Sequence, residues 1–306
     1  MRILKDNPIF ESPLEKLASY FSSGDLFYSA DTYLAFVCGA AGAKLPDGTP
    51  SMRAEFMRHV EQKVADRILC IKAEEAVADL FRQQEERNSN LAHFEKLIAS
   101  TVNSIVIFPE SPGSFAELGY FSAFPEICKK TIIGVRTRYQ DNSFISLGPI
   151  HYISSVSDYR PLPIALGDDY EAMFPTICER IAGNQGQRPY RKRFEKKSWK
   201  ELEPKERLAV IDEIVSVAAA LTEIDLRHII HTSFGSYDIS ELRMLLSLLV
   251  ASGRVARNGD GDVFSRFSAA KTFMESDERI SLKGRWLNAL KNSPDAYAEL
   301  KAVRNE

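Results

Sequence analysis

Short apolar runs alternate with amphipathic stretches along the first half of the chain. Residues 32–38 form a nearly continuous apolar run that ends at Gly39, a pattern typical of a buried parallel strand. Similar runs predict strands at 68–71, 104–108 and 131–135, and periodicity with caps predicts helices over 51–66, 74–82, 90–102 and 114–124. Because each crossover between parallel strands must cover a face of the sheet, this order predicts an α/β fold with a doubly wound, flavodoxin-like parallel sheet.

The second half has a different pattern. An apolar stripe at helical spacing predicts a helix over 202–221, and Asp238 and Gly253 are the expected cap and stop of another helix. Two short runs on either side of the turn 258–261 then form a hairpin pattern. Helix, turn, helix and hairpin is the order of a winged helix. We therefore expect a first domain over 1–187, a linker over 188–200 and a mostly helical winged-helix domain over 201–306.

The composition narrows the class of protein. With 306 residues, 44% hydrophobic and 26% charged, the chain excludes disordered, collagenous and disulfide-stapled proteins. No apolar run approaches the roughly 20 residues that span a bilayer, and the first residues lack the apolar core of a signal peptide. We expect a cytoplasmic protein with no membrane partner. The four cysteines form no CxxC pair, and His228 and His231 have no third ligand nearby, so no metal site is expected.

Charge is distributed unevenly. Residues 1–187 carry 18 basic and 24 acidic side chains, whereas residues 188–306 carry 21 and 18. The change is concentrated in the segment 188–200, where aromatic residues interleave with bases, including Arg188, Arg191, Lys192, Arg193, Lys196 and Lys197. Such a segment suits a polyanionic partner, and a solvated linker explains it equally well.

The predicted wing offers three further candidates for phosphate contacts, Arg254, Arg257 and Arg266. The preceding helix, over 238–250, carries only Arg243 as a base and is mostly apolar. That composition favours docking to a protein or a nucleic-acid hybrid over sequence-specific reading of a major groove.

Ligands of doubly wound sheets bind beyond the carboxyl ends of the strands, so two loops are of interest. The first follows Cys38, and its glycines Gly39 and Gly42 let a ligand approach the backbone closely or simply make a tight turn. Its spacing is wrong for a phosphate loop of the Walker A type, because no Ser or Thr follows Lys44.

The second loop, over 109–119, carries the sharper pattern. Ser114 and Glu117 have the spacing of a capping box, which is the structural interpretation. In the functional interpretation, Glu117 in the first helical turn is kept ionised by the positive helix end, as a nucleophile must be. Ser111, Gly113 and Ser114 then offer N–H groups and hydroxyls for a phosphate or a sugar.

The segment 105–119 resembles the nucleoside 2-deoxyribosyltransferase-like family, whose signature is a strand, a Pro/Ser/Gly loop and a Glu-Leu-Gly helix start. Together with the stretches 36–39 and 143–149 and the basic linker, it looks more narrowly like the effectors of retron antiphage systems. The resemblance implies that Glu117 is the nucleophile that attacks an anomeric carbon. It also implies a toxin that cleaves N-glycosidic bonds with NAD as the substrate, needs no separate cofactor, and is held by a reverse transcriptase and its DNA–RNA product, msDNA. A homo-oligomer or a higher assembly is compatible with this.

Two residues qualify that resemblance. These proteins often carry an acid before the strand, where this chain has Asn103, which still offers hydrogen bonds to a substrate but no charge. Glu110 is a second catalytic candidate, for orienting ribose hydroxyls or activating water, and is as easily a solvated loop acid.

Two other functions remain open. A DNA-binding regulator would use the first domain only to sense a nucleotide, without catalysis. A nucleoside deoxyribosyltransferase of salvage metabolism would exchange bases instead of hydrolysing the bond, but it does not need a C-terminal module.

Overall fold

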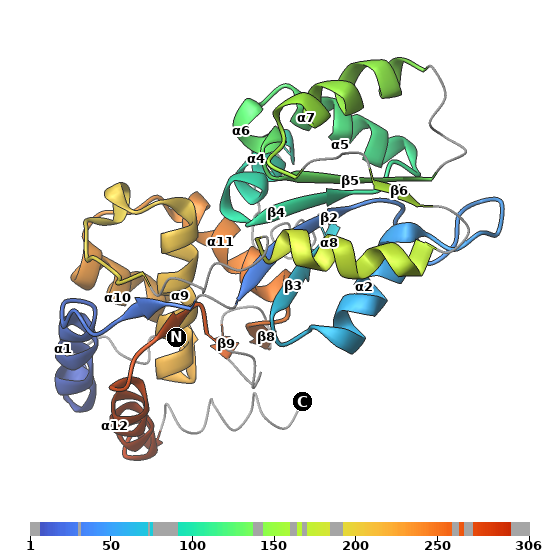
Figure 1. Cartoon of the computed structure of the whole chain (residues 1–306). Helices are drawn as coiled ribbons and strands as arrows, with labels where there is room; N and C mark the ends of the chain where they lie inside the picture. Colours follow the sequence, from blue (N-terminus) through green and yellow to red (C-terminus); the bar gives the residue numbers. More distant parts are fainter. Residues whose placement is uncertain are drawn as a thin grey trace. The chain divides into compact units, whose positions relative to one another are not determined.

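The computed structural model describes residues 7–29, 32–72, 74–75, 91–136, 143–159, 164–166, 170–183, 192–258, 263–265 and 272–294. These residues fall into two compact units (Figure 1), which we call the sheet unit and the helical unit. The sheet unit lies within 31–75 and 88–188, and the helical unit within 1–30 and 189–306. Residues 7–29 therefore belong with the C-terminal part of the chain, which differs from the expected domain over 1–187.

Five parallel strands form the sheet unit's sheet, in the order β3–β2–β4–β5–β6. The strands are β2 (Tyr33–Cys38), β3 (Ile68–Ile71), β4 (Ser104–Ile107), β5 (Thr131–Arg136) and β6 (Ile164–Leu166). The predicted α/β class and the parallel pairing are confirmed. The sequence pattern does not predict β6, because three residues are too few to show a period. The chain passes from β2 to the edge strand β3 and returns to β4, so the loops after β2 and β4 leave the sheet side by side.

Helices cover both faces of this sheet (Figure 1). On one face lie α2 (Met52–Lys63) and α8 (Phe174–Ile181), and on the other lie α4 (Leu91–Thr101), α5 (Pro112–Ser122), α6 (Pro125–Cys128) and α7 (His151–Val156). Aromatic rings join each layer to the sheet: Phe108 packs 5.7 Å from Phe56 of α2, and Phe36 packs 6.1 Å from Phe121 of α5. In the described parts of the chain, no helix is both long enough and apolar enough to cross a bilayer.

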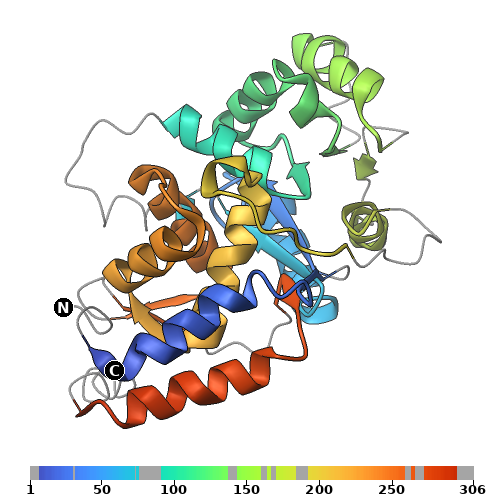
Figure 2. The same cartoon turned by 90° about the vertical axis from the view of Figure 1, so that its left-hand side faces the viewer.

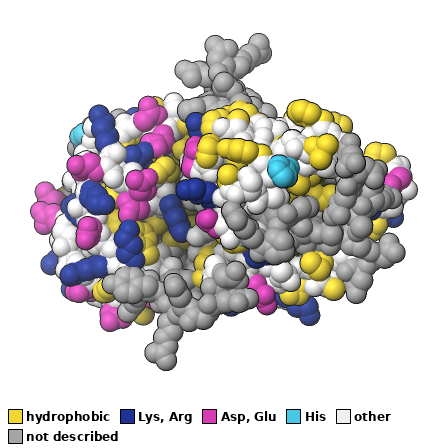
Figure 3. Space-filling view, turned by 45° about the horizontal axis from the view of Figure 1, so that its top comes forward, with side chains coloured by type: hydrophobic (Ala, Val, Ile, Leu, Met, Phe, Trp, Pro, Cys, Tyr) yellow, Lys and Arg dark blue, Asp and Glu magenta, His cyan; other side chains and the backbone are white. Residues whose placement is uncertain are grey.

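The segment before and within α7 exposes large apolar side chains. Phe144, Leu147 of η3 (Ser146–Ile150) and Tyr152 of α7 are 83%, 65% and 42% exposed. Figure 3 brings this side of the molecule forward and shows hydrophobic side chains gathered on it. The sheet unit therefore carries an apolar surface outside its core.

Helix α5 begins two residues earlier than the predicted start at 114. Ser111 is its N-cap, and its hydroxyl accepts a hydrogen bond from the Ser114 N–H at 3.2 Å. The Ser114 hydroxyl accepts in return from the Ser111 N–H at 3.0 Å, so these two serines form the capping box. The expected box of Ser114 and Glu117 is wrong, because Pro112, with no N–H to lose, takes the first helical position.

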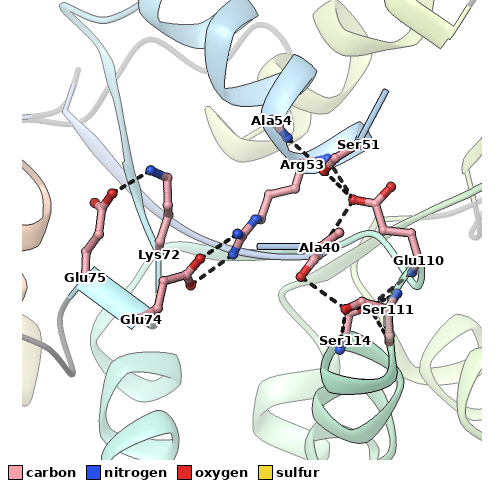
Figure 4. Close-up of polar contacts among 11 residues, drawn as sticks. Ala40, Ser51, Arg53, Ala54, Lys72, Glu74, Glu75, Glu110, Ser111 and Ser114 are labelled. Carbon is pink, nitrogen blue, oxygen red and sulfur yellow. Dashed lines mark hydrogen bonds and ion pairs between the residues drawn. The ribbon is translucent and has the colours of Figure 1, made fainter. Parts of the chain in front are cut away.

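A single carboxylate ties the loop after β4 to the start of α2. Glu110 accepts hydrogen bonds from the Ser51 hydroxyl at 2.8 Å and from three backbone N–H groups, those of Ala40, Met52 and Arg53, at 3.2, 2.8 and 3.2 Å (Figure 4). The carboxylate thus caps α2 from a loop almost sixty residues away and holds the loop after β2 as well.

The helical unit begins with η1 (Pro8–Phe10), α1 (Glu11–Tyr20) and β1 (Phe27–Tyr28), and its later elements pack on them. Helices α9 (Pro204–Ala218), α10 (Glu223–Phe234) and α11 (Ile239–Ala251) follow η5 (Trp199–Glu201). Strands β7 (Ala220–Thr222), β8 (Ala256–Asn258) and β9 (Val263–Ser265) form an antiparallel sheet in the order β7–β9–β8. The unit ends with β10 (Met274–Glu275), which pairs with β1, and α12 (Arg279–Lys291), which lies beside α1 (Figure 2).

The predicted helix over 202–221 is divided. Ala219 has a φ of 61°, a left-handed conformation that an α-helix cannot contain, so α9 ends at Ala218. The next three residues become β7 at the edge of the small sheet. A non-glycine residue in this conformation has no sequence pattern that announces it.

The expected linker is part of the helical unit. The Tyr28 N–H donates to the Lys192 carbonyl at 2.8 Å, and the Phe194 N–H donates to the Leu26 carbonyl at 2.7 Å. The Phe194 ring is 3% exposed and packs among the rings of the unit's core, 6.1 Å from Phe21. The described start of the basic segment, from Lys192 to Phe194, is therefore bonded to the N-terminal segment and is part of the folded unit.

Two consecutive buried carboxylates on α9 organise this unit. Asp212 accepts two hydrogen bonds from Arg254, at 3.1 and 3.0 Å, and neither side chain is more than 1% exposed. Glu213 accepts from the Tyr20 hydroxyl of α1 at 2.6 Å and from the Arg279 guanidinium of α12 at 2.7 and 2.8 Å. Burial raises the pKa of Glu213, and the charge and hydrogen bonds of Arg279 oppose that effect. These bonds join both ends of the chain to the central helix.

Arg254 is therefore not a phosphate contact of an exposed wing. We expect Arg254→Met to lower the free energy of unfolding by about 3–5 kcal/mol, because it removes the guanidinium that balances the buried charge of Asp212. Urea unfolding followed by circular dichroism measures this, with the exposed Lys197→Gln as a control that changes stability by less than about 0.5 kcal/mol. The double variant Asp212→Leu with Arg254→Met is expected to recover much of the loss. A stable single variant that only weakens nucleic-acid binding would contradict the buried role.

The loop after β2 needs a glycine at one position and tolerates a side chain at another. A Cβ at Gly39 would lie 2.6 Å from the Arg53 Cβ and 3.0 Å from the Glu110 Oε1, whereas at Gly42 the closest atom is 3.4 Å away. We expect Gly39→Ala to destabilise the sheet unit by about 1–3 kcal/mol. The added methyl group would collide with Arg53 and displace the Glu110 carboxylate from its hydrogen bonds. Gly42→Ala is the matched control, and thermal unfolding measures both. Equal melting temperatures for the two variants would show that Gly39 is not closely packed against Arg53 and Glu110.

Candidate active site

The loops after β2 and β4 meet at the carboxyl edge of the sheet. The Phe108 N–H donates to the Cys38 carbonyl at 2.9 Å, and the Ser111 hydroxyl donates to the Gly39 carbonyl at 3.3 Å. Figure 4 shows the Ser111 and Glu110 contacts together. The two loops that the sequence singles out are therefore hydrogen-bonded to each other and lie side by side at this edge.

The three candidates at the end of β2 and in the loop that follows it differ in exposure. The Cys38 side chain is 1% exposed, and burial with a hydrophobic strand accounts for it. Gly39 lies against Arg53 and Glu110, which explains the glycine by packing and not by contact with a ligand. Gly42 is exposed in a turn that ends where the Ser51 N–H donates to the Ala43 carbonyl. Of these three candidates, Gly42 lies at the surface.

In the second loop, the serine hydroxyls are used within the helix start. Ser114 is 0% exposed, and its hydroxyl also accepts from the Glu110 N–H at 3.1 Å. Ser111 is half-buried and engaged with Ser114 and Gly39. Gly113 is exposed, and a Cβ there would approach only the Ser111 Oγ, at 3.9 Å. The first turn of α5 thus has an open surface above Gly113.

Glu117 lies in the second turn of α5 and is half-buried. Side chains of a helix lean toward its N-terminus, so the Glu117 carboxylate leans over the turn that contains Gly113 and toward the carboxyl edge of the sheet. The positive end of the helix dipole favours the ionised carboxylate less than expected for a residue of the first turn, because this effect falls off within that turn. Its placement is nevertheless that of a group able to reach a ligand bound above the loops.

Glu110 is held in place by four donors, and this is a positioning arrangement. Both carboxylate oxygens accept hydrogen bonds from the start of α2, and one of them also accepts from Ala40. A carboxylate with that coordination is neither a solvated loop acid nor placed to activate water. Its chemical effect on the site is to fix the backbone around it.

Asn103 lies at the other end of the sheet. Its side-chain oxygen accepts from the Leu34 N–H at 3.0 Å, and its own N–H donates to the Leu34 carbonyl at 2.8 Å. Both contacts are at the amino ends of β2 and β4, and β4 is about 13 Å long at 3.3 Å per residue. The structure therefore does not bring Asn103 to the substrate side, because a residue that precedes a strand lies at the edge opposite to the residue that follows it.

Two arginines that the sequence pattern does not single out lie at the carboxyl edge of the sheet. Arg53 of α2 is 5% exposed and donates to both carboxylate oxygens of Glu74, one at 3.0 Å and the other at 2.5 Å (Figure 4). Burial alone would raise the pKa of Glu74, but the hydrogen bonds and charge of Arg53 outweigh it and lower the pKa. Arg136 ends β5 and donates to the Thr49 hydroxyl at 3.3 Å and to the Pro50 carbonyl. A charged residue directly after a predicted strand is the signal that would have identified Arg136.

The candidate bases for a nucleic-acid or protein partner are divided among several environments. Lys196 contacts the end of α1, with its Nζ 3.4 Å from the Ala18 carbonyl and 3.1 Å from the Ser22 hydroxyl. Arg193 donates to the Gly24 carbonyl, and Lys192 lies 3.8 Å from Glu206. Lys197 is exposed, and Arg257 of β8 is half-buried. Arg188, Arg191 and Arg266 lie outside the described residues.

Helix α11 offers little positive charge. Its one base, Arg243, is ion-paired with Glu223 at 2.9 Å, and most of its apolar residues are buried. Nor do the described residues bring three His, Cys, Asp or Glu side chains together as a possible metal site.

Comparison with known proteins places the chain in a family. Residues 49–257 match the family described as STM3845 retron effector protein. The Escherichia coli protein named "Retron Ec73 putative ribosyltransferase/DNA-binding protein" is 31% identical over 123 residues, which cover 40% of this chain and 38% of that protein. Its counterpart from retron Ec86 of the same species, with the same description, is 36% identical over 81 residues, or 26% of each chain. The matched parts span less than half the length of these relatives. Since the family match covers more than half of the chain, the chain belongs to the STM3845 retron effector protein family.

Proposed function

We propose that the protein is an effector toxin of a retron antiphage system that cleaves the N-glycosidic bond of NAD or a related nucleotide. The observation that carries the proposal is the position of Glu117, a half-buried carboxylate in the second turn of α5, the helix that starts from the loop after β4. Membership of a retron effector family and the ribosyltransferase description of two relatives support it. The carboxyl edge of a parallel sheet is where such ligands bind.

The chemistry needs few groups. Cleavage of a C–N glycosidic bond passes through an oxocarbenium-like transition state, which Glu117 stabilises by its charge or traps as a covalent intermediate. Water then releases the sugar and regenerates the carboxylate. With NAD, the nicotinamide leaves as a neutral base, so no strong general acid is required. The rigid backbone that Glu110 fixes keeps the reacting carbon and the carboxylate aligned.

The helical unit is proposed as the docking module for the reverse transcriptase and its msDNA. The order α9, β7, α10, α11, β8, β9, with the small sheet in the order β7–β9–β8, supports a winged-helix domain. The neutralised Arg243 and the buried Arg254 argue against a recognition helix with a basic wing. We therefore assign to this unit the recognition of a nucleoprotein surface and not of a base sequence.

A nucleotide-sensing, DNA-binding regulator is the second candidate, favoured by the DNA-binding description of the two relatives. It predicts nucleotide affinity with no turnover, so catalysis separates the two functions.

Glu117→Gln is expected to lower the rate of nicotinamide release from NAD by at least about three orders of magnitude, because the amide removes the nucleophile. The stability should not change, since Ser111 and Ser114 cap α5 without it. Chromatography of the products from the purified protein, alone and with its reverse transcriptase–msDNA complex, measures release. Cleavage of other nucleotides but not of NAD would move the substrate, and no turnover in either state would favour the regulator.

Glu110→Gln is expected to behave in the opposite way. The amide can accept the N–H groups on one side only, so the tie weakens and the free energy of unfolding falls by about 1.5–3 kcal/mol. The folded fraction should still turn over substrate, with the loss appearing in KM more than in kcat. A stable but inactive Glu110→Gln would instead make Glu110 a catalytic residue.

A further inference from the structure

Arg136 lies at the carboxyl edge of the sheet, next to the loops of the candidate site. It is the last residue of β5, which pairs with β4 through Ile133 and Ile107. Arg136 lies three residues after Ile133, and Glu110 lies three residues after Ile107, in the loop that follows β4. Its guanidinium therefore stands at the same edge as the loops that carry the candidate site.

The guanidinium is fixed by neutral groups. Nη1 donates to the Thr49 hydroxyl at 3.3 Å and Nη2 donates to the Pro50 carbonyl, while the buried Nε has no hydrogen-bond partner. Thr49 in turn donates its hydroxyl to Asp47, so Arg136 reaches that carboxylate only through Thr49. Among the described residues, Nη1 and Nη2 thus each make one hydrogen bond, and since each carries two N–H groups, both keep capacity for an anion.

Neighbouring arginines of the described sheet unit are neutralised directly. Arg53 is paired with Glu74, and Arg58 with Glu55 and with Glu171 at 3.6 Å. For Arg136, no carboxylate lies within ion-pair distance among the described residues. A half-buried cation without a counter-charge is costly, and an anionic ligand removes that cost.

We propose that Arg136 binds a phosphate group of the nucleotide, so that the site selects phosphorylated nucleotides over free nucleosides. The planar guanidinium suits phosphate oxygens, and Thr49 and Pro50 hold it in place before the ligand arrives. The Nη2 contact lies at the surface, which leaves that end within reach of a ligand. This inference rests on the nucleotide-binding site proposed above and names the residue that reads the charge of the substrate.

The test is equilibrium binding by calorimetry, which needs no turnover. The full-length protein is titrated with NAD and with the four ribonucleoside 5′-monophosphates, each against its free nucleoside. We expect at least one monophosphate to bind better than its nucleoside, and Arg136→Gln to weaken binding of that monophosphate and of NAD about 10- to 100-fold while leaving the nucleoside unchanged. Arg136→Lys keeps the positive charge but lacks the planar pair of N–H donors, so it should give an intermediate loss of affinity.

Arg58→Gln is the matched control, because it removes the same charge from an arginine that is already paired. It should leave binding unchanged, and equal losses in both variants would reduce the effect to long-range charge and overturn the inference. Equal affinity for monophosphate and nucleoside, or no binding of either, would overturn it as well. Glu117→Gln should keep the preference for phosphate. If the unmodified protein prefers the monophosphate but turns over no nucleotide, the proposed catalysis fails and the role of Arg136 stands.

Discussion

The Glu110 carboxylate is the constraint on which the candidate site depends. It accepts four hydrogen bonds, which satisfy N–H groups at the start of α2 and fix the loop after β2 to the loop after β4. Buried N–H groups at a helix start are costly when unsatisfied, so the tie is an energetic requirement of the fold. It also explains Gly39, whose missing side chain lets Arg53 and Glu110 come close. Arg53 can then reach Glu74, and the loops after β2, β3 and β4 become one connected edge.

A similar constraint governs the helical unit. Asp212 and Glu213 follow each other on α9, so their side chains leave the helix about 100° apart and bind different partners. One takes Arg254 and the other takes Tyr20 and Arg279, which brings the first and last described helices onto the central one. Arg254 and Arg279 are ion-paired within the unit, so their charges are neutralised and add little to the attraction of a nucleic acid. Counting charges along the sequence therefore overstates the positive surface of the unit. Arg193 and Lys196 contact the N-terminal segment through neutral oxygens and are exposed, so they still contribute to that surface.

How much of this is readable from the sequence depends on the range of the interaction. Four strands of the sheet are predictable, because each is a run of apolar side chains that the parallel sheet buries. The start of α5 is misplaced by two residues because two serines three apart compete with a serine and a glutamate at the same spacing. The partner of Glu110 is beyond any local pattern, since it lies almost sixty residues away. For Asn103 the family pattern is misleading. It marks the residue before β4, which lies at the amino edge of the sheet, away from the loops after β2 and β4.

The geometry of adjacent strands connects the two proposed roles. Glu117 lies on the helix that follows β4, and Arg136 ends β5, which is hydrogen-bonded to β4 at a spacing of about 4.8 Å. In a nucleotide, the anomeric carbon and the carbon that carries the 5′-phosphate arm are both bonded to the ring oxygen of one ribose. A ligand lying across the carboxyl edge can therefore present its glycosidic bond to the carboxylate and its phosphate to the arginine. The anion bound at β5 would orient the sugar, and the carboxylate beside β4 would act on a carbon whose position is already set. A carboxylate on the helix after β4 and a guanidinium at the end of β5 thus match the charges of a nucleotide whose glycosidic bond is breaking, with the phosphate negative and the anomeric carbon becoming positive.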